Sequence, residues 1–198
     1  MATYSKTNGQ TLFALASTAA SSVAIGSAMD VSTKIGGLVF TRFGRRSATA
    51  AGAGVIIRLE ASQSASADNS WFPFASFTTD FAACESEAVS GTVSSGTNVV
   101  TVASTTNLVI GSLVYIDNST IANSEWGRVQ SISANVSITL EDNLVNAQTG
   151  STLYTLAEIY SPVSIPEGAM RIRAVADGSS FTQAFAAQIL CSTIDGIA

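Results

Sequence analysis

Residues 91–154 constrain the fold of this chain more than any other stretch. Short apolar runs alternate there with Gly, Ser, Asn and Thr, and the runs at 98–102 and 113–116 are rich in β-branched and aromatic residues. Such residues suit a pleated surface that is buried on one face. Because the runs are short and bounded by turn residues, the stretch predicts a small domain built from β-strands.

Within this stretch, residues 126–132 alternate with the period of two that a half-buried strand has. The alternation predicts Trp126 and Ile132 on one face and Val129 on the opposite face. Residues 133–135, Ser-Ala-Asn, then favour a hairpin into the following strand.

Other parts of the chain show the same alternation. Residues 136–140 predict a strand with Val136 on the same face as Leu140, and residues 55–60 predict one whose odd-numbered side chains face one way. Residues 169–176 alternate in the same manner, with the arginines on one face. Each of these runs is typical of a half-buried antiparallel strand.

The strand-like runs outside the central stretch need one another as partners. Those in residues 22–90 and 157–198 have no complete sheet of their own, so we expect them to pair and to enclose residues 91–156 as an inserted domain. The predicted fold is all-β, an outer antiparallel β-sandwich with a small inserted β-barrel-like domain. Residues 1–21 are predicted to form an N-terminal arm, either extended or a short helix, and residues 181–190 either a strand or a helix.

The chain of 198 residues carries little charge. Charged residues make up 12% of it, against about 25% in typical soluble domains. Two interpretations stay open, a Ser/Thr-rich β-protein or a subunit whose surface is covered by neighbours. The net charge of −5, with no basic run longer than Arg45-Arg46, argues against nucleic-acid binding. No apolar run is long enough to span a bilayer, and no signal peptide is expected.

Residue types that common catalytic sites need are missing or sparse. The chain has no histidine, which removes the commonest general base together with Ser-His-Asp and Cys-His systems. Cys84 and Cys191 could form a disulfide, but free thiols in a reducing compartment are favoured. We therefore expect no enzyme activity, no cofactor and no metal site.

Carboxylates come close together at Glu141 and Asp142. With Asp117 and Asn118 they could offer oxygen ligands to Ca²⁺, but the fixed loop spacing of a calcium site is missing. Adjacent residues on a strand point to opposite faces, and no histidine accompanies the pair. Solvated turn carboxylates are favoured over a calcium site or a hydrolase built on two carboxylates.

The densest aromatic group lies in residues 71–77. Strand alternation predicts Phe72 and Phe74 on one face and Trp71 with Ala75 on the other, and a proline within the run indicates an edge strand. The aromatic rings could form a platform for a carbohydrate. Packing in a core or against another subunit is the favoured interpretation.

Several segments resemble small β-modules of structural proteins from tailed bacteriophages. The similar runs are residues 111–117, 124–129 and 138–144, and residues 57–60 and 70–74 are similar to the same kind of protein. The resemblance implies a head decoration (cement) protein or a head–tail connector component, located in the virion and assembled in the host cytoplasm. It implies the major capsid protein or other virion proteins as partners, and it carries no active site with it.

The sequence therefore predicts a non-enzymatic virion protein that associates with itself and with its neighbours, and neither nucleic acid, membrane nor a small molecule is expected to bind. A carbohydrate-binding module is the alternative, and its candidate stacking residues are Trp71, Phe72, Tyr115 and Trp126. The predicted interaction residues are the prominent aromatic side chains and the adjacent arginines: Trp71, Phe72, Phe74, Tyr115, Trp126, Arg45 and Arg46.

Overall fold

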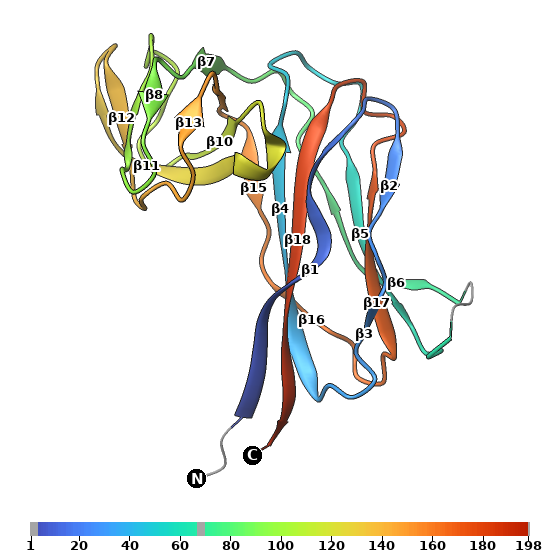
Figure 1. Ribbon diagram of the computed structural model, residues 1–198. Coiled ribbons are helices and arrows are strands. Elements are labelled where there is room, and N and C mark those ends of the chain that lie inside the picture. Colours follow the sequence, from blue (N-terminus) through green and yellow to red (C-terminus); the bar gives the residue numbers. More distant parts are fainter. Residues whose placement is uncertain (1–3, 67–69, 198) are drawn as a thin grey trace.

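The computed structural model describes residues 4–66 and 70–197, which form an almost wholly antiparallel β structure (Figure 1). Within these residues the one helical element is a short 3-10 helix, η1 (Ile121–Asn123). Two sheets pack as a sandwich, and further strands form a curled module at one end of it. The predicted fold class is confirmed.

Sheet 1 contains both ends of the described chain. Its strands in spatial order are β1 (Tyr4–Thr18), β18 (Phe185–Ile197), β4 (Gly36–Arg45) and β15 (Ala157–Ile159), and β16 (Val163–Ser164) also pairs with β4. β1 and β18 run on past the sandwich as a two-stranded ribbon, so the two ends of the chain lie together (Figure 1).

Sheet 2 faces sheet 1 across the core. Its strands in spatial order are β2 (Val23–Ile25), β17 (Arg171–Asp177), β5 (Ile56–Ser62) and β6 (Phe72–Thr78), and β3 (Met29–Asp30) also pairs with β17. β6 is an edge strand, as the proline in it predicts.

The sandwich closes by pairing segments that are far apart in the sequence. β4 pairs with β18 over its whole length, and β5 pairs with β17 over its whole length. Neither half could bury its apolar face alone, because each supplies only some of the strands of both sheets. The inserted module therefore interrupts a sandwich whose two parts fold together.

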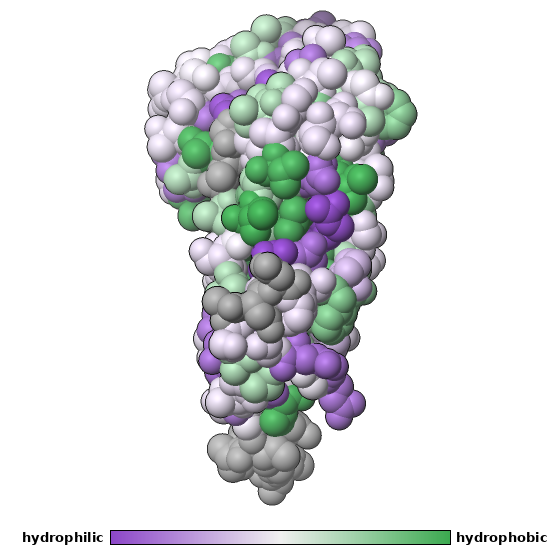
Figure 2. Space-filling model, turned by 90° about the vertical axis from the view of Figure 1, so that its right-hand side faces the viewer, coloured by the Kyte–Doolittle hydropathy of each residue, from purple (hydrophilic) through white to green (hydrophobic). Residues whose placement is uncertain are grey.

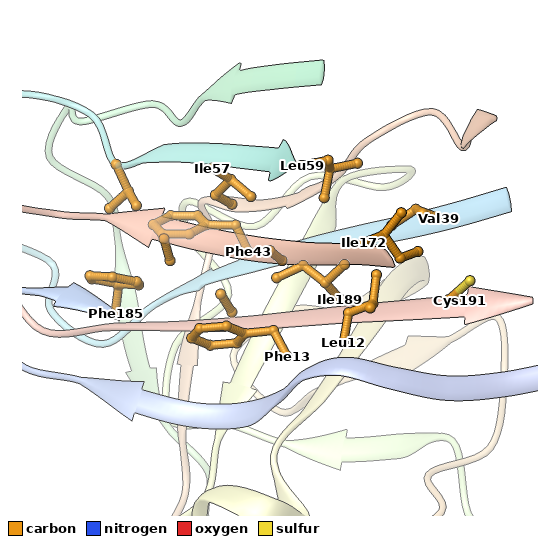
Figure 3. Close-up of a cluster of buried hydrophobic side chains, with 14 of the residues drawn as sticks. Leu12, Phe13, Val39, Phe43, Ile57, Leu59, Ile172, Phe185, Ile189 and Cys191 are labelled. Atoms are coloured by element: carbon orange, nitrogen blue, oxygen red, sulfur yellow. The ribbon is translucent and has the colours of Figure 1, made fainter. Parts of the chain in front are cut away.

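The core of the sandwich consists of aliphatic and aromatic side chains from the inner faces of both sheets (Figure 3). Full burial of such a side chain contributes about 1.5–3 kcal/mol. The predicted alternation of residues 55–60 is confirmed, because Val55, Ile57 and Leu59 are fully buried. Other members of the core are Leu12, Val39, Phe43, Ile172, Phe181, Phe185 and Ile189.

The N-terminal segment is a strand of sheet 1, not a helix or a separate arm. Leu12 and Phe13 of β1 belong to the core of the sandwich, and the strand pairs with β18 through several bulges. Gly26 permits this packing, because a Cβ there would collide with the carbonyl oxygen of Leu12. At the other end of the chain, the segment predicted as strand or helix forms β18 from Phe185 onward.

The inserted module has its own core, formed by apolar side chains such as Val100, Val114, Ile138 and Leu153. The first strand of its main sheet along the chain is β7 (Ser86–Ala88), which precedes the predicted boundary at residue 91. In spatial order its strands are β7 (Ser86–Ala88), β14 (Thr152–Tyr154), β10 (Leu113–Asp117), β11 (Glu125–Ser133), β12 (Ser137–Leu140) and β9 (Val99–Thr101), and a second pair joins β13 (Gln148–Thr149) to β8 (Thr92–Val93).

Two predictions of alternation in this module are wrong. The pairing of β11 with β12 shifts register after Val129, so Val129 is fully buried and Ile132 also packs against the core. An extra residue in one strand turns the following side chains to the other face. Val136 is exposed, because it lies in the hairpin turn before β12, where Asn135 has a φ of 53°. The hairpin itself is confirmed.

Candidate interaction surfaces

Tyr115 and Gly44 form the centre of the contact between the inserted module and the outer face of sheet 1. Tyr115, on β10, is fully buried, and its ring lies directly over Gly44 of β4. A Cβ at Gly44 would lie 2.5 Å from Cγ of the ring, so a side chain there has no space. Burial raises the pKa of the Tyr115 hydroxyl far above its usual value. Only glycine lets the module sit this close to the sheet.

Trp126, on β11, packs beside Tyr115 with the ring centroids 4.9 Å apart. Its Nε1 donates a hydrogen bond to the carbonyl oxygen of Phe43, at 2.8 Å. The guanidinium of Arg42 lies 5.9 Å from the Trp126 ring centroid. Trp126 therefore joins the two modules of one chain.

Arg46 and Asp117 close the rim of this junction with an ion pair. Nε of Arg46 donates to both carboxylate oxygens of Asp117, at 2.9 Å each. The Tyr115 hydroxyl donates to Asp117 as well, at 3.4 Å. Both charged side chains are mostly buried, which strengthens a charge-assisted hydrogen bond compared with an exposed pair.

Arg45, predicted as an interaction residue, is fully buried. Its guanidinium donates to the carbonyl oxygens of Ala82 and Thr49, and it lies 5.3 Å from the ring centroid of Phe181. Among the described residues its Nε has no hydrogen-bond partner. The side chain holds the segments around residues 49 and 82 against the sandwich, so the prediction of an outward role for it is wrong.

The aromatic residues of β6 point in different directions. The pairing of β5 with β6 shifts register so that Phe74 is an extra residue, and both Phe74 and Ala75 pack against the core. The prediction that Ala75 faces away from Phe74 is therefore wrong. Phe72 is 40% exposed at the rim of the sheet. Trp71 lies on the outer side, with its ring centroid 4.3 Å from the guanidinium of Arg173.

The outer face of sheet 2 carries an apolar patch formed by the exposed side chains of Val23, Ile25 and Ile56, which lie around the buried Val175. Ile25 is directly opposite Val175, while Val23 and Ile56 flank Asp177 in the next row. Residues directly opposite in antiparallel strands point to the same face. Ile25 is 60% exposed, Val23 50% and Ile56 38%. Figure 2 shows hydrophobic side chains gathered on this side of the molecule.

A ladder of ion pairs continues from the apolar patch along the same face. Arg58 pairs with Asp177 at 3.2 Å and with Glu60 at 3.6 Å, and Arg173 pairs with Glu60 at 2.7 Å. In Figure 2 a stripe of hydrophilic side chains runs next to the hydrophobic ones. The predicted arginine face of residues 169–176 is therefore the outer face of the sandwich.

Asp117, Asn118 and Glu141, three of the four residues considered for a calcium site, have partners within the chain. Asp117 pairs with Arg46, the amide nitrogen of Asn118 donates to the side-chain oxygen of Gln148, and Glu141 lies 3.8 Å from Nε of Arg128. In residues 4–66 and 70–197, no group of three or more acidic, cysteine or histidine side chains is arranged to hold a metal ion.

Cys84 and Cys191 are both free thiols. Cys191 is buried in the core of the sandwich, and this burial raises the pKa of its thiol to about 11. Cys84 is half-buried, and its pKa is also raised by burial. A raised pKa keeps a thiol protonated and unreactive near neutral pH.

Neither a protein-family model nor a curated protein matches this chain. In the part of the chain that the structure describes, no helix is long and apolar enough to cross a bilayer.

The apolar patch is the feature that the sequence did not single out as a site. Val23 and Ile25 alternate with Ala24, so the short run indicates a strand but not which face meets the core. The distinguishing signal is the size of the alternating residues, because the small Ala24 packs against the core while its larger neighbours are exposed.

Proposed function

We propose that this chain is a non-enzymatic structural subunit of a tailed-phage virion, a decoration (cement) protein that stabilises the exterior of the head through contacts with neighbouring subunits. The observation that carries the proposal is the difference between the outer faces of sheet 1 and sheet 2. The junction residues are engaged within the chain, while the outer face of sheet 2 presents exposed apolar side chains beside ion pairs. Exposed apolar patches of this kind mark interaction sites.

The physical basis of such a role is the burial of apolar surface at many equivalent positions. A half-exposed Val or Ile that becomes buried contributes about 1 kcal/mol, which is little for one contact. In a closed shell the contact is repeated, and each subunit held at two points gains from the high effective concentration of the second site. The packed junction matters here, because a module that moved freely relative to the sandwich would lower this effective concentration.

The low charge of the chain fits the same role. A surface that is covered after assembly does not need the dense charge that keeps a free monomer soluble. The similarity of residues 111–117 and 138–144 to modules of phage structural proteins supports the virion as the setting. Among the predicted stacking residues for a sugar, Tyr115 is fully buried and Trp126 is engaged at the junction, so the geometry does not favour the carbohydrate-binding alternative.

The test uses heads of the source phage assembled without this chain. Purified chain is added in increasing amounts, and bound protein is measured by co-sedimentation and by electron microscopy of the particles. We expect saturable binding at many regularly spaced sites and a higher temperature for disruption of the decorated heads. Absence of binding would contradict the proposal. Binding confined to a single vertex would replace the cement role with a head–tail connector role.

A further inference from the structure

The outer face of sheet 2 has no net charge, although the chain as a whole carries −5. The face contains three of the nine cationic side chains of the chain and an equal number of carboxylates. These charged residues are Arg58, Arg171, Arg173, Asp30, Glu60 and Asp177. The whole excess of negative charge therefore lies on other parts of the chain.

This distribution of charge favours contact between two copies through this face. Anywhere else, two copies would bring surfaces together that on average share a negative charge, and like charges across an interface are unfavourable. On this face, positive and negative groups alternate along the ladder, so a copy related by a two-fold axis can place opposite charges near each other. A two-fold contact requires such a self-complementary surface.

The apolar patch gives such a contact its attractive part. With the two-fold axis passing near Ile25, the patch of one copy packs against the patch of the other, and Val23, Ile25 and Ile56 lose their exposed area. The charged residues of each ladder are already paired within their own chain. They can therefore remain at the rim of the contact without leaving an unpaired charge behind.

The dimensions of the face predict a weak contact. β17, β5 and β6 have seven residues each, and β2 and β3 together line the free side of β17. With strands about 4.8 Å apart and a rise of about 3.3 Å per residue, the face covers roughly 19 by 23 Å. Such a footprint is at the low end for specific interfaces and is typical of reversible association in the micromolar range or weaker. A weak two-fold contact is sufficient in a lattice, where other contacts hold the same subunits.

We infer that the outer face of sheet 2 is a contact between two copies of this chain, with the patch of Val23, Ile25 and Ile56 packed on its own symmetry mate. The inference rests on the proposed function and deepens it by naming the partner and the surface. A larger shell protein as the partner of this face is the competing outcome of the test.

The experiment compares two single substitutions that introduce the same charge at equally exposed isoleucines. Ile25 is 60% exposed on the patch, and Ile110 is 62% exposed on the inserted module. Wild type, Ile25→Asp and Ile110→Asp are studied by sedimentation equilibrium between about 10 and 500 μM. Circular dichroism and thermal melting establish that each variant is folded.

We expect the average mass of wild type to rise towards a dimer with concentration. Ile25→Asp should weaken the association at least about tenfold, because it places a charge in an apolar contact, and Ile110→Asp should leave it unchanged. Higher salt should strengthen association of wild type, since it screens the repulsion between two copies of charge −5. A monomeric wild type over the whole range, or equal weakening by both substitutions, would overturn the inference.

A second measurement avoids placing an aspartate in β2, where it could disturb folding. Ile25→Cys and Ile110→Cys are each made with Cys84→Ser, and disulfide-linked dimers are quantified after mild oxidation. The inference predicts rapid linkage through position 25 and slow linkage through position 110. Equal rates for the two positions would overturn it.

Binding of the same variants to heads separates the two proposals. If wild type binds heads but never dimerises, and Ile25→Asp binds heads less well, the face contacts a shell protein and the inference alone fails. If wild type dimerises through this face but does not bind heads, the proposed function fails and the inference stands.

Discussion

The outer faces of the two sheets of the sandwich differ in whether another part of the chain covers them. On sheet 1 the upper part of the face is covered by the inserted module, with Tyr115 over Gly44 and Trp126 bonded to Phe43. On sheet 2 the corresponding face leaves Val23 and Ile25 half exposed or more. The outer face of sheet 1 is covered within the chain, and the outer face of sheet 2 exposes aliphatic side chains.

This difference explains why aromatic residues alone were misleading guides to an interaction site. A ring that fits a neighbouring backbone closely, as Tyr115 does, is a sign of a permanent contact that folding completes. Medium-sized aliphatic residues on a flat sheet face, such as Ile25, can associate reversibly. In this molecule the surface available to partners is therefore marked by exposed aliphatic residues and balanced charge, and the junction by buried aromatic ones.

The largest effect is expected from a substitution that breaks the covered face. Gly44→Ala places a Cβ 2.5 Å from Cγ of the Tyr115 ring, and because that ring is buried it cannot move without displacing the module. We expect a loss of about 3 kcal/mol in the free energy of unfolding, measured by denaturant titration. Gly36→Ala on the same strand is the matched control, since its Cβ would meet its nearest neighbour only at 3.9 Å.

The control should change the free energy of unfolding by less than about 0.5 kcal/mol. Equal effects of the two substitutions would mean that the junction does not constrain the sheet, and the contrast between the two faces would lose its basis. Fluorescence of Trp126 gives a second readout, because its hydrogen bond to Phe43 depends on the position of the module.

The sequence predicted the strands of the sandwich well wherever pairing is uninterrupted. Residues 55–60 alternate cleanly, and their buried and exposed sides agree with the structure. Alternation failed at Phe74 and after Val129, where a bulge places an extra residue in one strand. A bulge depends on the partner strand and on the packing around it, and neither is visible in a single short run.

The candidate site was predicted less well than the fold, for a related reason. Residue type singled out Tyr115 and Trp126 as interaction residues, but it could not indicate that they make contacts within the chain. Arg45 looked like a surface cation, and its burial depends on carbonyl oxygens at Thr49 and Ala82 that come together only in the folded chain. Partner identity is a property of the tertiary structure.

A smaller effect is expected when the ion pairs of the two faces are compared by double-mutant cycles. Arg46→Gln with Asp117→Asn tests the junction, and Arg58→Gln with Asp177→Asn tests the outer face of sheet 2. The junction pair is more buried and has two hydrogen bonds of 2.9 Å, against one of 3.2 Å for the other. We expect coupling energies of about 1–2 kcal/mol at the junction and about 0.5 kcal/mol on the exposed face.

Denaturant titration of the single and double variants provides both coupling energies. A larger coupling on the exposed face would show that burial does not distinguish the two pairs. In that case the ladder of sheet 2 would be a structural element of the monomer, and its role at the rim of a dimer would need another explanation.

The smallest effect concerns the ribbon, where sheet 1 extends past the sandwich and neither the module nor sheet 2 supports it. Asp195 of β18 accepts hydrogen bonds from Thr7 of β1 and from Thr193, and it pairs with Lys34 at 2.9 Å. These partners, Thr7 first, lower the pKa of Asp195 to about 2. A carboxyl group whose pKa is lowered by folding stabilises the folded state above its ordinary pKa near 3.8. That contribution is lost as the pH falls through about 2.

An NMR titration of the Asp195 carboxyl carbon between about pH 1.5 and 6 measures this directly. Thr7→Val should raise the pKa, because the hydrogen bond from Thr7 is the largest single contribution to the shift. No response to Thr7→Val would show that the hydrogen bond from Thr7 does not lower the pKa, and a wild-type midpoint near the ordinary value would show that none of these partners does. If Thr7→Val has no effect, the ribbon of sheet 1 would depend on charge, whereas the part of sheet 1 under the module depends on packing.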